Sequence, residues 1–216
     1  MDQQFNLSVV ELLFSRMCHD LVGPVGAAVN GVELLEEFGN EMAEEALGLL
    51  GSSARVASKR LRVYRVAYGM ATGAAITSLS DLKSLVDDYL EGGKIDLLWP
   101  DENIGRATQL QRLGIKLILN LVICATEAMP RGGKLDLSVE PVDSKIQVNV
   151  KTTGEGVRLA EGVSEAFHTD INVASLDPRT VQSYFTGKIA ESLDANFKCV
   201  EEADGIVFSA IIPSGA

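Results

Sequence analysis

The strongest pattern in the sequence is a set of apolar or small residues spaced three and four positions apart over residues 10–71. This spacing is typical of long α-helices that pack side by side. Ser8 and Glu11 form a capping box at the expected start of one helix, Gly39 ends it, and Asn40 can cap a second helix. The sequence therefore predicts an antiparallel helical hairpin. The seam positions are Val10, Phe14, Met17, Leu21, Pro24, Ala28, Gly31, Leu35 and Phe38, then Ala43, Leu47, Leu50, Ala54, Ala57, Leu61, Tyr64, Tyr68 and Ala71.

Each helix of this hairpin carries more apolar surface than one antiparallel neighbour can cover. A hairpin of this kind usually pairs with a second copy to form a four-helix bundle. We therefore expect a homodimer. The alternative is that the C-terminal half of the chain covers the second apolar stripe, which consists of Met42, Leu49, Val56, Val63 and Met70.

After Gly73 the pattern changes to strands interleaved with shorter helices. This order predicts an α+β fold in which helices cover one face of a mostly antiparallel sheet. We expect two domains, residues 1–75 and 76–216, with a linker near 74–79. The predicted helices are 81–91 (capped by Ser80), 108–129 and 179–193, and the predicted strands are 94–99, 134–140, 145–151, 196–202 and 205–213.

The charge of the chain limits its function. Lys and Arg number 19 and Asp and Glu 30, which gives 19 − 30 = −11. This balance argues against nucleic-acid binding. No stretch approaches the roughly 20 apolar residues that span a membrane, and the first residues do not resemble a signal peptide. The three cysteines lack metal-ligand spacing. We expect a cytoplasmic protein without nucleic-acid or membrane partners.

His19 is the first candidate for chemistry, because it lies opposite the apolar seam, where a core histidine would not be found. Val22, Gly23 and Gly26 leave the helix surface beyond it unusually bare, and Arg16 precedes it. Each helical glycine costs about 1 kcal/mol relative to alanine. That cost is understandable if a partner's backbone comes close. Pro24 predicts a local bend just beyond His19.

A basic strip on the second helix is expected at the level of His19. The hairpin turn lies near residues 39–40, so Lys59 and Arg60 should lie beside His19. Arg55, Lys59 and Arg62 share one helix face. In an acidic protein this strip suggests a bound anion or an acidic partner, although an ordinary solvated face would look the same.

Residues 14–25, FSRMCHDLVGPV, resemble the H-box of the histidine-kinase dimerisation and phosphotransfer domain. With the following NGVELLEE they are most similar to the ChpT-like histidine phosphotransferases of alphaproteobacterial phosphorelays. The resemblance covers nearly the whole chain. It implies that His19 accepts a phosphoryl group and that Asp20 orients or deprotonates the imidazole. Val22 and Gly23 replace the basic residue and the Thr or Asn of the kinase pattern, so phosphatase activity is not expected.

The C-terminal half resembles the GHKL ATP-binding fold of these kinases but departs from its nucleotide motifs. Cys124 stands where the N-box pattern has an Asn, and Thr152 stands where the next motif has an Asp. No Gly-rich phosphate loop appears between Gly156 and Val181. We interpret this half as a degenerate ATP-binding domain that docks the partner, with no cofactor of its own. His168 is expected on a loop or at the surface.

These observations favour a homodimeric phosphotransferase that takes a phosphoryl group from one receiver domain and passes it to the aspartate of another. The resemblance implies CtrA-like and CpdR-like response regulators and the receiver domain of a CckA-like hybrid kinase as partners. Mg²⁺ is expected on the receiver, with no metal site on this chain. The alternatives are an ATP-dependent histidine kinase and a non-catalytic module that binds receivers.

Overall fold

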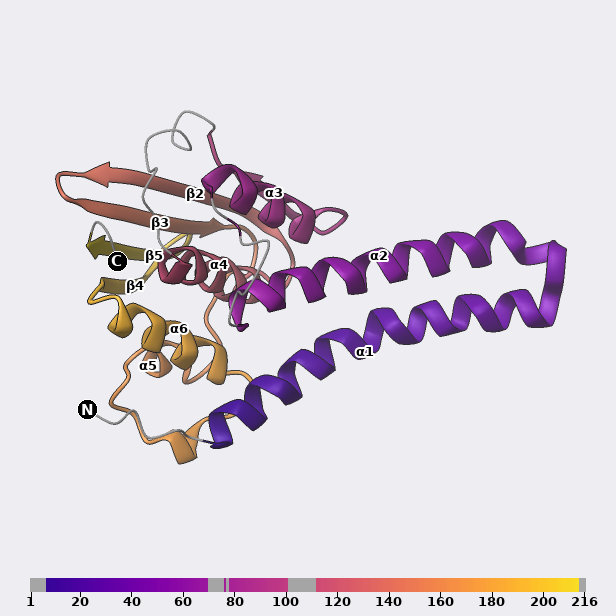
Figure 1. Ribbon diagram of the computed structural model, residues 1–216, viewed down its shortest axis with the longest axis horizontal. Coiled ribbons are helices and arrows are strands. Elements are labelled where there is room, and N and C mark those ends of the chain that lie inside the picture. Colours follow the sequence, from indigo (N-terminus) through magenta and orange to yellow (C-terminus); the bar gives the residue numbers. More distant parts are fainter. Residues whose placement is uncertain (1–6, 70–75, 77, 101–111, 214–216) are drawn as a thin grey trace.

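The computed structural model describes residues 7–69, 76, 78–100 and 112–213. Its N-terminal part is a long hairpin of two helices, α1 (Leu7–Phe38) and α2 (Ala43–Ala67), which extends away from the rest of the molecule (Figure 1). Gly39 has a left-handed backbone with φ 57° and ends α1 as predicted. The predicted cap at Asn40 is wrong, because residues Gly39–Met42 form a 3₁₀ turn, η1, and α2 begins only after Met42.

α1 and α2 approach each other closely near the far end of the hairpin. A Cβ atom on Gly31 would lie 2.9 Å from the carbonyl oxygen of Ala46 and 3.0 Å from the backbone nitrogen of Leu50. Only glycine fits between the two backbones there. α1 remains one helix through Pro24, and Figure 1 shows it bending part way along its length.

The C-terminal part contains the predicted alternation of helices and strands, with small differences at the ends. α3 begins two residues earlier than predicted, and its cap is Ser78, whose hydroxyl accepts a hydrogen bond from the Asp81 backbone at 3.0 Å. The elements are α3 (Leu79–Leu90), β1 (Ile95–Leu98), α4 (Arg112–Glu127), β2 (Gly133–Val142), β3 (Lys145–Thr153), α5 (Val163–Ala166), the 3₁₀ turn η3 (Val173–Ser175), α6 (Val181–Ser192), β4 (Asn196–Glu202) and β5 (Gly205–Pro213).

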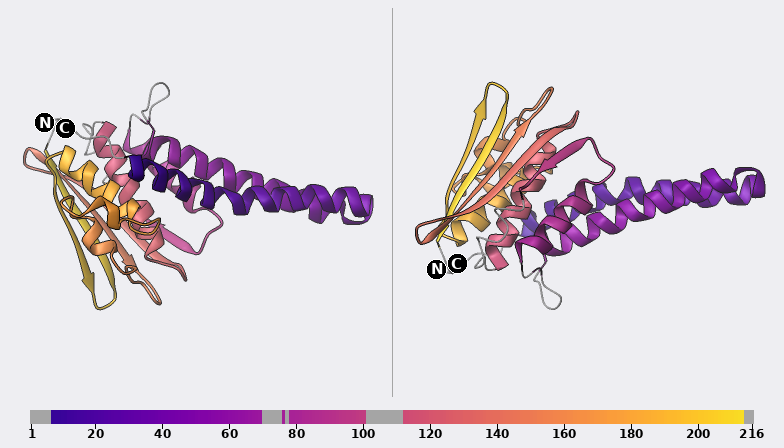
Figure 2. Two further views of the ribbon diagram at one scale, coloured as in Figure 1. Left: turned by 90° about the horizontal axis from the view of Figure 1, so that it is seen from below. Right: turned by 90° about the horizontal axis from the view of Figure 1, so that it is seen from above.

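The five strands form one sheet in the order β1-β2-β3-β5-β4. β1 pairs with β2 in parallel, and the other pairs are antiparallel, as predicted. Leu137, Val150 and Phe208 lie in register across three neighbouring strands and are fully buried. Figure 2 shows that the helices cover one face of this sheet. The α+β fold class is confirmed.

One hydrophobic core joins the sheet, its covering helices and the base of the hairpin. α4 is buried along most of its length, from Gly114 to Ala125. Val63, Tyr64 and Ala67 of α2 belong to the same core. The C-terminal half therefore covers the second apolar stripe only at the base of α2: Val63 is fully buried, whereas Val56 farther out is exposed.

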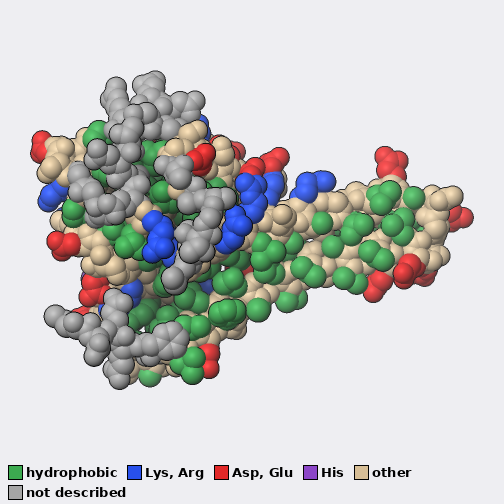
Figure 3. Space-filling model, viewed as in Figure 1, with side chains coloured by type: hydrophobic (Ala, Val, Ile, Leu, Met, Phe, Trp, Pro, Cys, Tyr) green, Lys and Arg blue, Asp and Glu red, His purple; other side chains and the backbone are tan. Residues whose placement is uncertain are grey.

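Beyond its base, the hairpin has an open apolar face. Many of its seam residues do not pack between α1 and α2 but point to solvent in the single chain, with Phe14 at 62% and Leu47 at 57% exposure. Figure 3 shows apolar side chains following the hairpin on one side, with acidic side chains at its tip. Among the residues that the structure describes, no helix combines the length and hydropathy needed to cross a bilayer. We define the open apolar face by Phe14, Val25, Val32, Leu47 and Leu61.

Candidate functional site

His19 lies on α1 near the base of the hairpin with its side chain 89% exposed. The predicted exposure is therefore confirmed. Its Nδ1 atom is 3.5 Å from Oδ1 of Asp20, the next residue along the helix. An exposed imidazole with a carboxylate at one nitrogen has its other nitrogen free to react with an incoming group.

Two residues of α2 hold Asp20 in place. The hydroxyl of Tyr64 donates a hydrogen bond to Oδ2 of Asp20 at 2.6 Å. The guanidinium of Arg60 donates to the backbone carbonyl oxygen of Asp20. Arg60 was expected at this level of the hairpin. Tyr64 was assigned only to the apolar seam, and nothing in the sequence indicated that its hydroxyl reaches the acid beside His19.

Tyr64 is a buried and persistently protonated donor. Its side chain is buried, and its ring packs against Tyr68 with 5.5 Å between centroids. Burial and the neighbouring Tyr89 raise the pKa of the Tyr64 hydroxyl far above its ordinary value, and the hydrogen bond to Asp20 acts in the same direction. The hydroxyl therefore keeps its proton throughout the physiological range.

Arg16 lies one turn before His19 and binds within the chain. It was predicted to face a partner, but its side chain is only 13% exposed. Its guanidinium forms an ion pair with Glu127 of α4 and donates to the carbonyl oxygen of Pro178 at 2.8 Å. Its Nε atom is buried and has no hydrogen-bond partner among the residues that the structure describes. Arg16 therefore ties α1 to the C-terminal half, a contact that the sequence did not indicate, and its predicted contact with a partner stays a prediction.

A cleft of about 500 Å³ separates His19 from the C-terminal half. Acidic side chains, arginines and apolar side chains line it, and both the hairpin and the C-terminal half contribute charged groups. The lining residues are Ser15, Arg16, His19, Asp20, Cys124, Glu127, Ala128, Arg158, Leu159, Ala160, Val163, Pro178, Arg179 and Ser183.

The surface beyond His19 is as bare as the sequence suggested. Val22 is 68% exposed. Cβ atoms added to Gly23 and Gly26 would meet no atom of the other described parts of the chain within 4 Å. The space over these residues is therefore open to another molecule, and their contact with a partner stays a prediction.

The basic strip of α2 is less free than expected. Lys59 forms an ion pair with Glu91, and Arg62 donates to the Asp88 carboxylate of α3 at 2.7 Å. The Lys59 side chain is only 21% exposed, whereas Arg55 is exposed. Lys59 and Arg62 therefore face the acids of α3, which the sequence pattern could not reveal, and part of the positive charge of the strip is neutralised.

The remnants of the expected nucleotide motifs are occupied by bonds within the chain. The Nδ2 of Asn120 donates to the carbonyl oxygens of Ala67 at 3.2 Å and Lys116 at 2.7 Å. Its Oδ1 accepts a hydrogen bond from Gln182 at 2.8 Å. Thr152 is buried, and its hydroxyl bonds the backbone of Ile206 on β5.

The remaining sequence expectations concern His168, Cys124 and a possible metal site. His168 is exposed in the turn that follows α5, as predicted. Cys124 is buried, which raises the pKa of its thiol, and its sulfur lies 3.5 Å from the Thr186 hydroxyl. Within the described ranges there is no group of three His, Cys, Asp or Glu side chains that could hold a metal ion.

Comparisons with known proteins agree with this arrangement. Residues 79–205 match the family described as histidine phosphotransferase C-terminal domain. The chain is 34% identical over 205 residues to the protein phosphotransferase ChpT of Brucella abortus strain 2308, covering 94% of this chain and 95% of that protein. A solved structure titled as a bacterial phosphotransferase has a TM-score of 0.79 and 32% identity, covering 96% of this chain and 98% of the other.

The family match spans more than half of the chain, and the similarity to ChpT extends across the hairpin that carries His19. The predicted resemblance is therefore confirmed, and the chain belongs to the histidine phosphotransferase family, whose members act in phosphorelays.

Proposed function

We propose that His19 is the phosphoryl acceptor and donor of this phosphotransferase. The observation that carries the proposal is the combination of an imidazole that is 89% exposed with a carboxylate 3.5 Å from its Nδ1 atom. Among the described residues, His168 is the other histidine. It lies in an exposed turn, and within the described part of the chain its imidazole has no hydrogen bond or ion pair with a carboxylate. Residues of α5, α6 and β4 line the pocket beside it, with Glu191 as the acid among them.

In this reaction the lone pair of His19 Nε2 attacks the phosphorus of an aspartyl phosphate on a receiver. The N–P bond forms while the P–O bond to that aspartate breaks, and the electron pair of the broken bond stays on the departing carboxylate. The phosphorylated ring carries positive charge, which Asp20 offsets from the Nδ1 side. The reverse steps pass the phosphoryl group to the next aspartate. Catalysis by positioning and charge is typical of phosphoryl transfer.

The partners in this proposal are receiver domains, with CtrA-like and CpdR-like response regulators and a CckA-like hybrid kinase as the candidates implied by the sequence. Such a receiver would bring its own Mg²⁺. Val22, Gly23 and Gly26 offer it a bare surface next to His19, and Arg55 offers positive charge farther along α2. The cytoplasmic location expected from the sequence remains part of this proposal.

We further infer that the active species is a homodimer. The open apolar face runs along both helices, since the antiparallel geometry puts Phe14 and Leu61 on the same side of the hairpin. These two residues line one groove. A second hairpin that packs on this face would complete a four-helix bundle and leave His19, on the opposite side of α1, free.

We also propose that the chain does not use ATP. Asn120, Thr152 and Cys124 are all buried, and each is within hydrogen-bond distance of another group of the chain. The expected result is that millimolar Mg²⁺-ATP leaves the melting temperature unchanged. A shift with Mg²⁺-ATP that AMP or phosphate does not produce would instead favour the histidine kinase alternative.

The experiment that tests the role of His19 is phosphoryl transfer from a phosphorylated receiver to the wild type and to His19→Ala. The variant should accept no acid-labile label while it keeps the fold and the oligomeric state of the wild type, because the His19 side chain buries little surface. His168→Ala is the matched control and should be labelled normally. Label on His19→Ala would refute the assignment, and receiver binding without any label on the wild type would favour the non-catalytic module.

A further inference from the structure

Asp20 cannot be directed at His19 by the helix alone. Neighbouring residues of an α-helix point about 100° apart, and side chains at i and i+1 do not face each other. A carboxylate at position 20 that was free to rotate would spend much of its time in solvent. In the structure one of its oxygens, Oδ1, lies on the His19 side.

The group that fixes this arrangement comes from the other helix. The Tyr64 hydroxyl donates a hydrogen bond to Oδ2 of Asp20 at 2.6 Å. Hydrogen bonds this short are typical of charged acceptors. The Asp20 carboxylate is still 30% exposed, so water could satisfy it without Tyr64. The tyrosine therefore selects one orientation of the acid.

A buried tyrosine hydroxyl needs some acceptor, and the bond to Asp20 could in principle serve only the fold. Tyr68, one turn further along α2, provides the comparison. Its hydroxyl donates to Oε1 of Gln182 at the same distance of 2.6 Å, in a buried polar cluster on α4 and α6. The hydroxyl of each tyrosine thus has an acceptor at the base of the hairpin, but only the acceptor of Tyr64 is the acid next to His19.

We propose that Tyr64 is a positioning residue for phosphoryl transfer. Its hydroxyl holds Oδ2 of Asp20, so that Oδ1 accepts a hydrogen bond from Nδ1–H of His19. The Nε2 atom of His19 is then left unprotonated as the nucleophile. This inference rests on the proposed role of His19. It assigns to α2 a share of the chemistry that the H-box pattern on α1 does not contain. Because Tyr64 acts through Asp20 and is itself buried, it affects the transfer step and not receiver binding.

The test compares Tyr64→Phe with the matched control Tyr68→Phe, since each removes one hydroxyl from a 2.6 Å hydrogen bond. Transfer from a phosphorylated receiver is followed by rapid quench over a range of receiver concentrations. For Tyr64→Phe we expect the rate at saturation to fall roughly tenfold, as for the loss of a hydrogen bond to a charged group, with the half-saturating concentration unchanged. Tyr68→Phe should transfer at the wild-type rate.

A double-mutant cycle with Asp20→Asn separates positioning from a general loss of structure. If Tyr64 acts through the carboxylate, Tyr64→Phe should have little further effect on the rate in the Asp20→Asn background. Equal rates for Tyr64→Phe and Tyr68→Phe, or an undiminished effect of Tyr64→Phe without the carboxylate, would overturn the inference. Both of these results would leave the role of His19 intact, because that role stands or falls with His19→Ala.

The tautomer of His19 gives a second readout that does not depend on how the tyrosine variants fold. Nitrogen-15 NMR of the wild type should show the neutral ring protonated at Nδ1, with the Nε2–H form increasing in Asp20→Asn. A wild-type ring that is protonated mainly at Nε2 would exclude the proposed arrangement directly.

Discussion

The hairpin and the C-terminal half use the same apolar residue types in opposite ways. Leu117, Leu121 and Leu137 in the C-terminal half have no exposed surface. On the hairpin, Leu47 and Leu61 are more than half exposed. The C-terminal half and the base of the hairpin share one closed core, whereas the hairpin beyond its base presents a face that the described part of the chain leaves uncovered. An apolar pattern in a sequence therefore predicts that a surface is buried, but it does not tell whether the same chain or another molecule covers that surface.

Polar groups follow the same division. Asn120 and Gln182 are buried between α4 and α6 and bond each other, so this polar cluster is closed to other molecules. His19 lies on the hairpin near its base and is open to solvent. The C-terminal half supports the base of the hairpin through the Arg16–Glu127 ion pair and the shared core, and the proposed phosphoryl acceptor lies on the hairpin.

The largest expected effect comes from placing one substitution, Leu→Ala, in each region. Leu121→Ala removes a fully buried side chain and should destabilise the fold by about 2–5 kcal/mol. Leu47→Ala should lower the free energy of unfolding much less. It should weaken the proposed dimer, because in a two-fold dimer the substitution is present on both sides of the interface. Chemical denaturation at fixed protein concentration and sedimentation measure the two effects.

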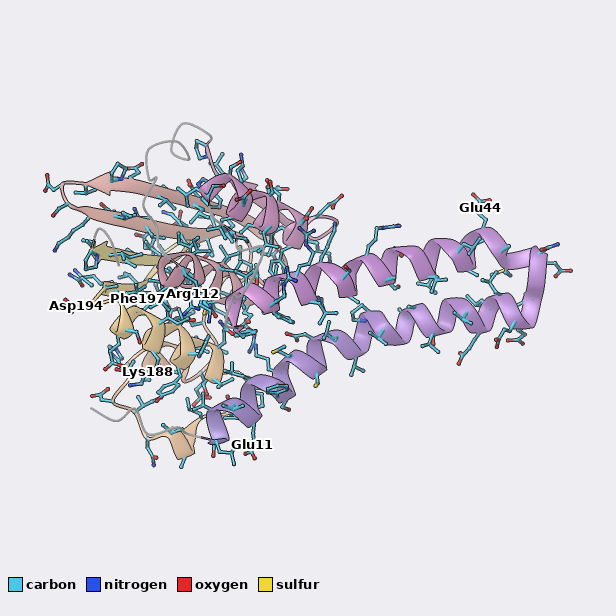
Figure 4. The ribbon with its side chains drawn as sticks, in the orientation of Figure 1. Glu11, Glu44, Arg112, Lys188, Asp194 and Phe197 are labelled. Carbon is cyan, nitrogen blue, oxygen red and sulfur yellow. The ribbon has the colours of Figure 1, made fainter. Side chains whose placement is uncertain are left out.

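The comparison would fail if Leu47→Ala destabilised the fold as much as Leu121→Ala, or if the wild type were a monomer at micromolar concentration. Glu44→Ala is the control for the hairpin, because Figure 4 shows Glu44 near the hairpin tip on the side of α2 that points away from α1. It should alter neither the stability nor the oligomeric state.

The C-terminal sheet could be predicted closely because its strands have one covered face. Residues 133–153 alternate apolar and polar side chains, and this alternation gave both strands of the β2–β3 hairpin. Helix ends were less predictable. Ser80 and Ser78 both suit a cap, and only the packing of Leu79 and Leu82 into the core decides between them. The one-turn helix α5 was not predicted, because four residues are too few to show the spacing of apolar residues that marks a helix.

The site was predicted in part. The exposure of His19 follows from the helix period alone, since the period fixes which face a residue occupies. The partners of Arg16, Lys59 and Tyr64 depend on where other elements pack against α1 and α2, over separations that no local pattern encodes. The sequence thus predicted the exposed face on which His19 lies but not the contacts that Asp20 and Arg16 make beside it.

A smaller effect is expected from filling the bare surface near His19. Gly26→Arg has open space for its side chain and replaces a poor helix former with a good one, so the fold should be as stable or more stable. Receiver binding should weaken roughly tenfold, or about 1.4 kcal/mol, because the arginine occupies the docking surface. Surface binding and transfer rates with a phosphorylated receiver measure this.

Gly48→Arg is the matched control, since Gly48 is also helical and open but lies near the hairpin tip. It should bind and transfer like the wild type. If Gly26→Arg transferred at the wild-type rate, the receiver would have to approach His19 from another side, and the two glycines would need a different explanation.

The smallest effect is expected at Lys59, where the hairpin meets α3. Charge reversal, Lys59→Glu, should slow association with an acidic receiver more than it speeds dissociation, because a charge at the edge of an interface acts mainly during approach. The ion pair with Glu91 already offsets part of this charge, and Lys59 in turn holds the pKa of the Glu91 carboxyl below its ordinary value through its hydrogen bond and charge. We therefore expect only a roughly two- to threefold lower association rate at low ionic strength, and less at high salt.

Glu91→Gln tests the same ion pair, and its expected effect on the association rate is the opposite of that of Lys59→Glu. It leaves Lys59 without its counter-charge, so association in stopped-flow measurements should become faster than for the wild type, again mainly at low salt. If Glu91→Gln slowed association, or if the effect of Lys59→Glu were equal at both ionic strengths, the pair would serve only to hold α2 against α3. In that case the attraction for a receiver would have to come from Arg55 of the hairpin or from the arginines that the C-terminal half contributes to the cleft, Arg158 and Arg179.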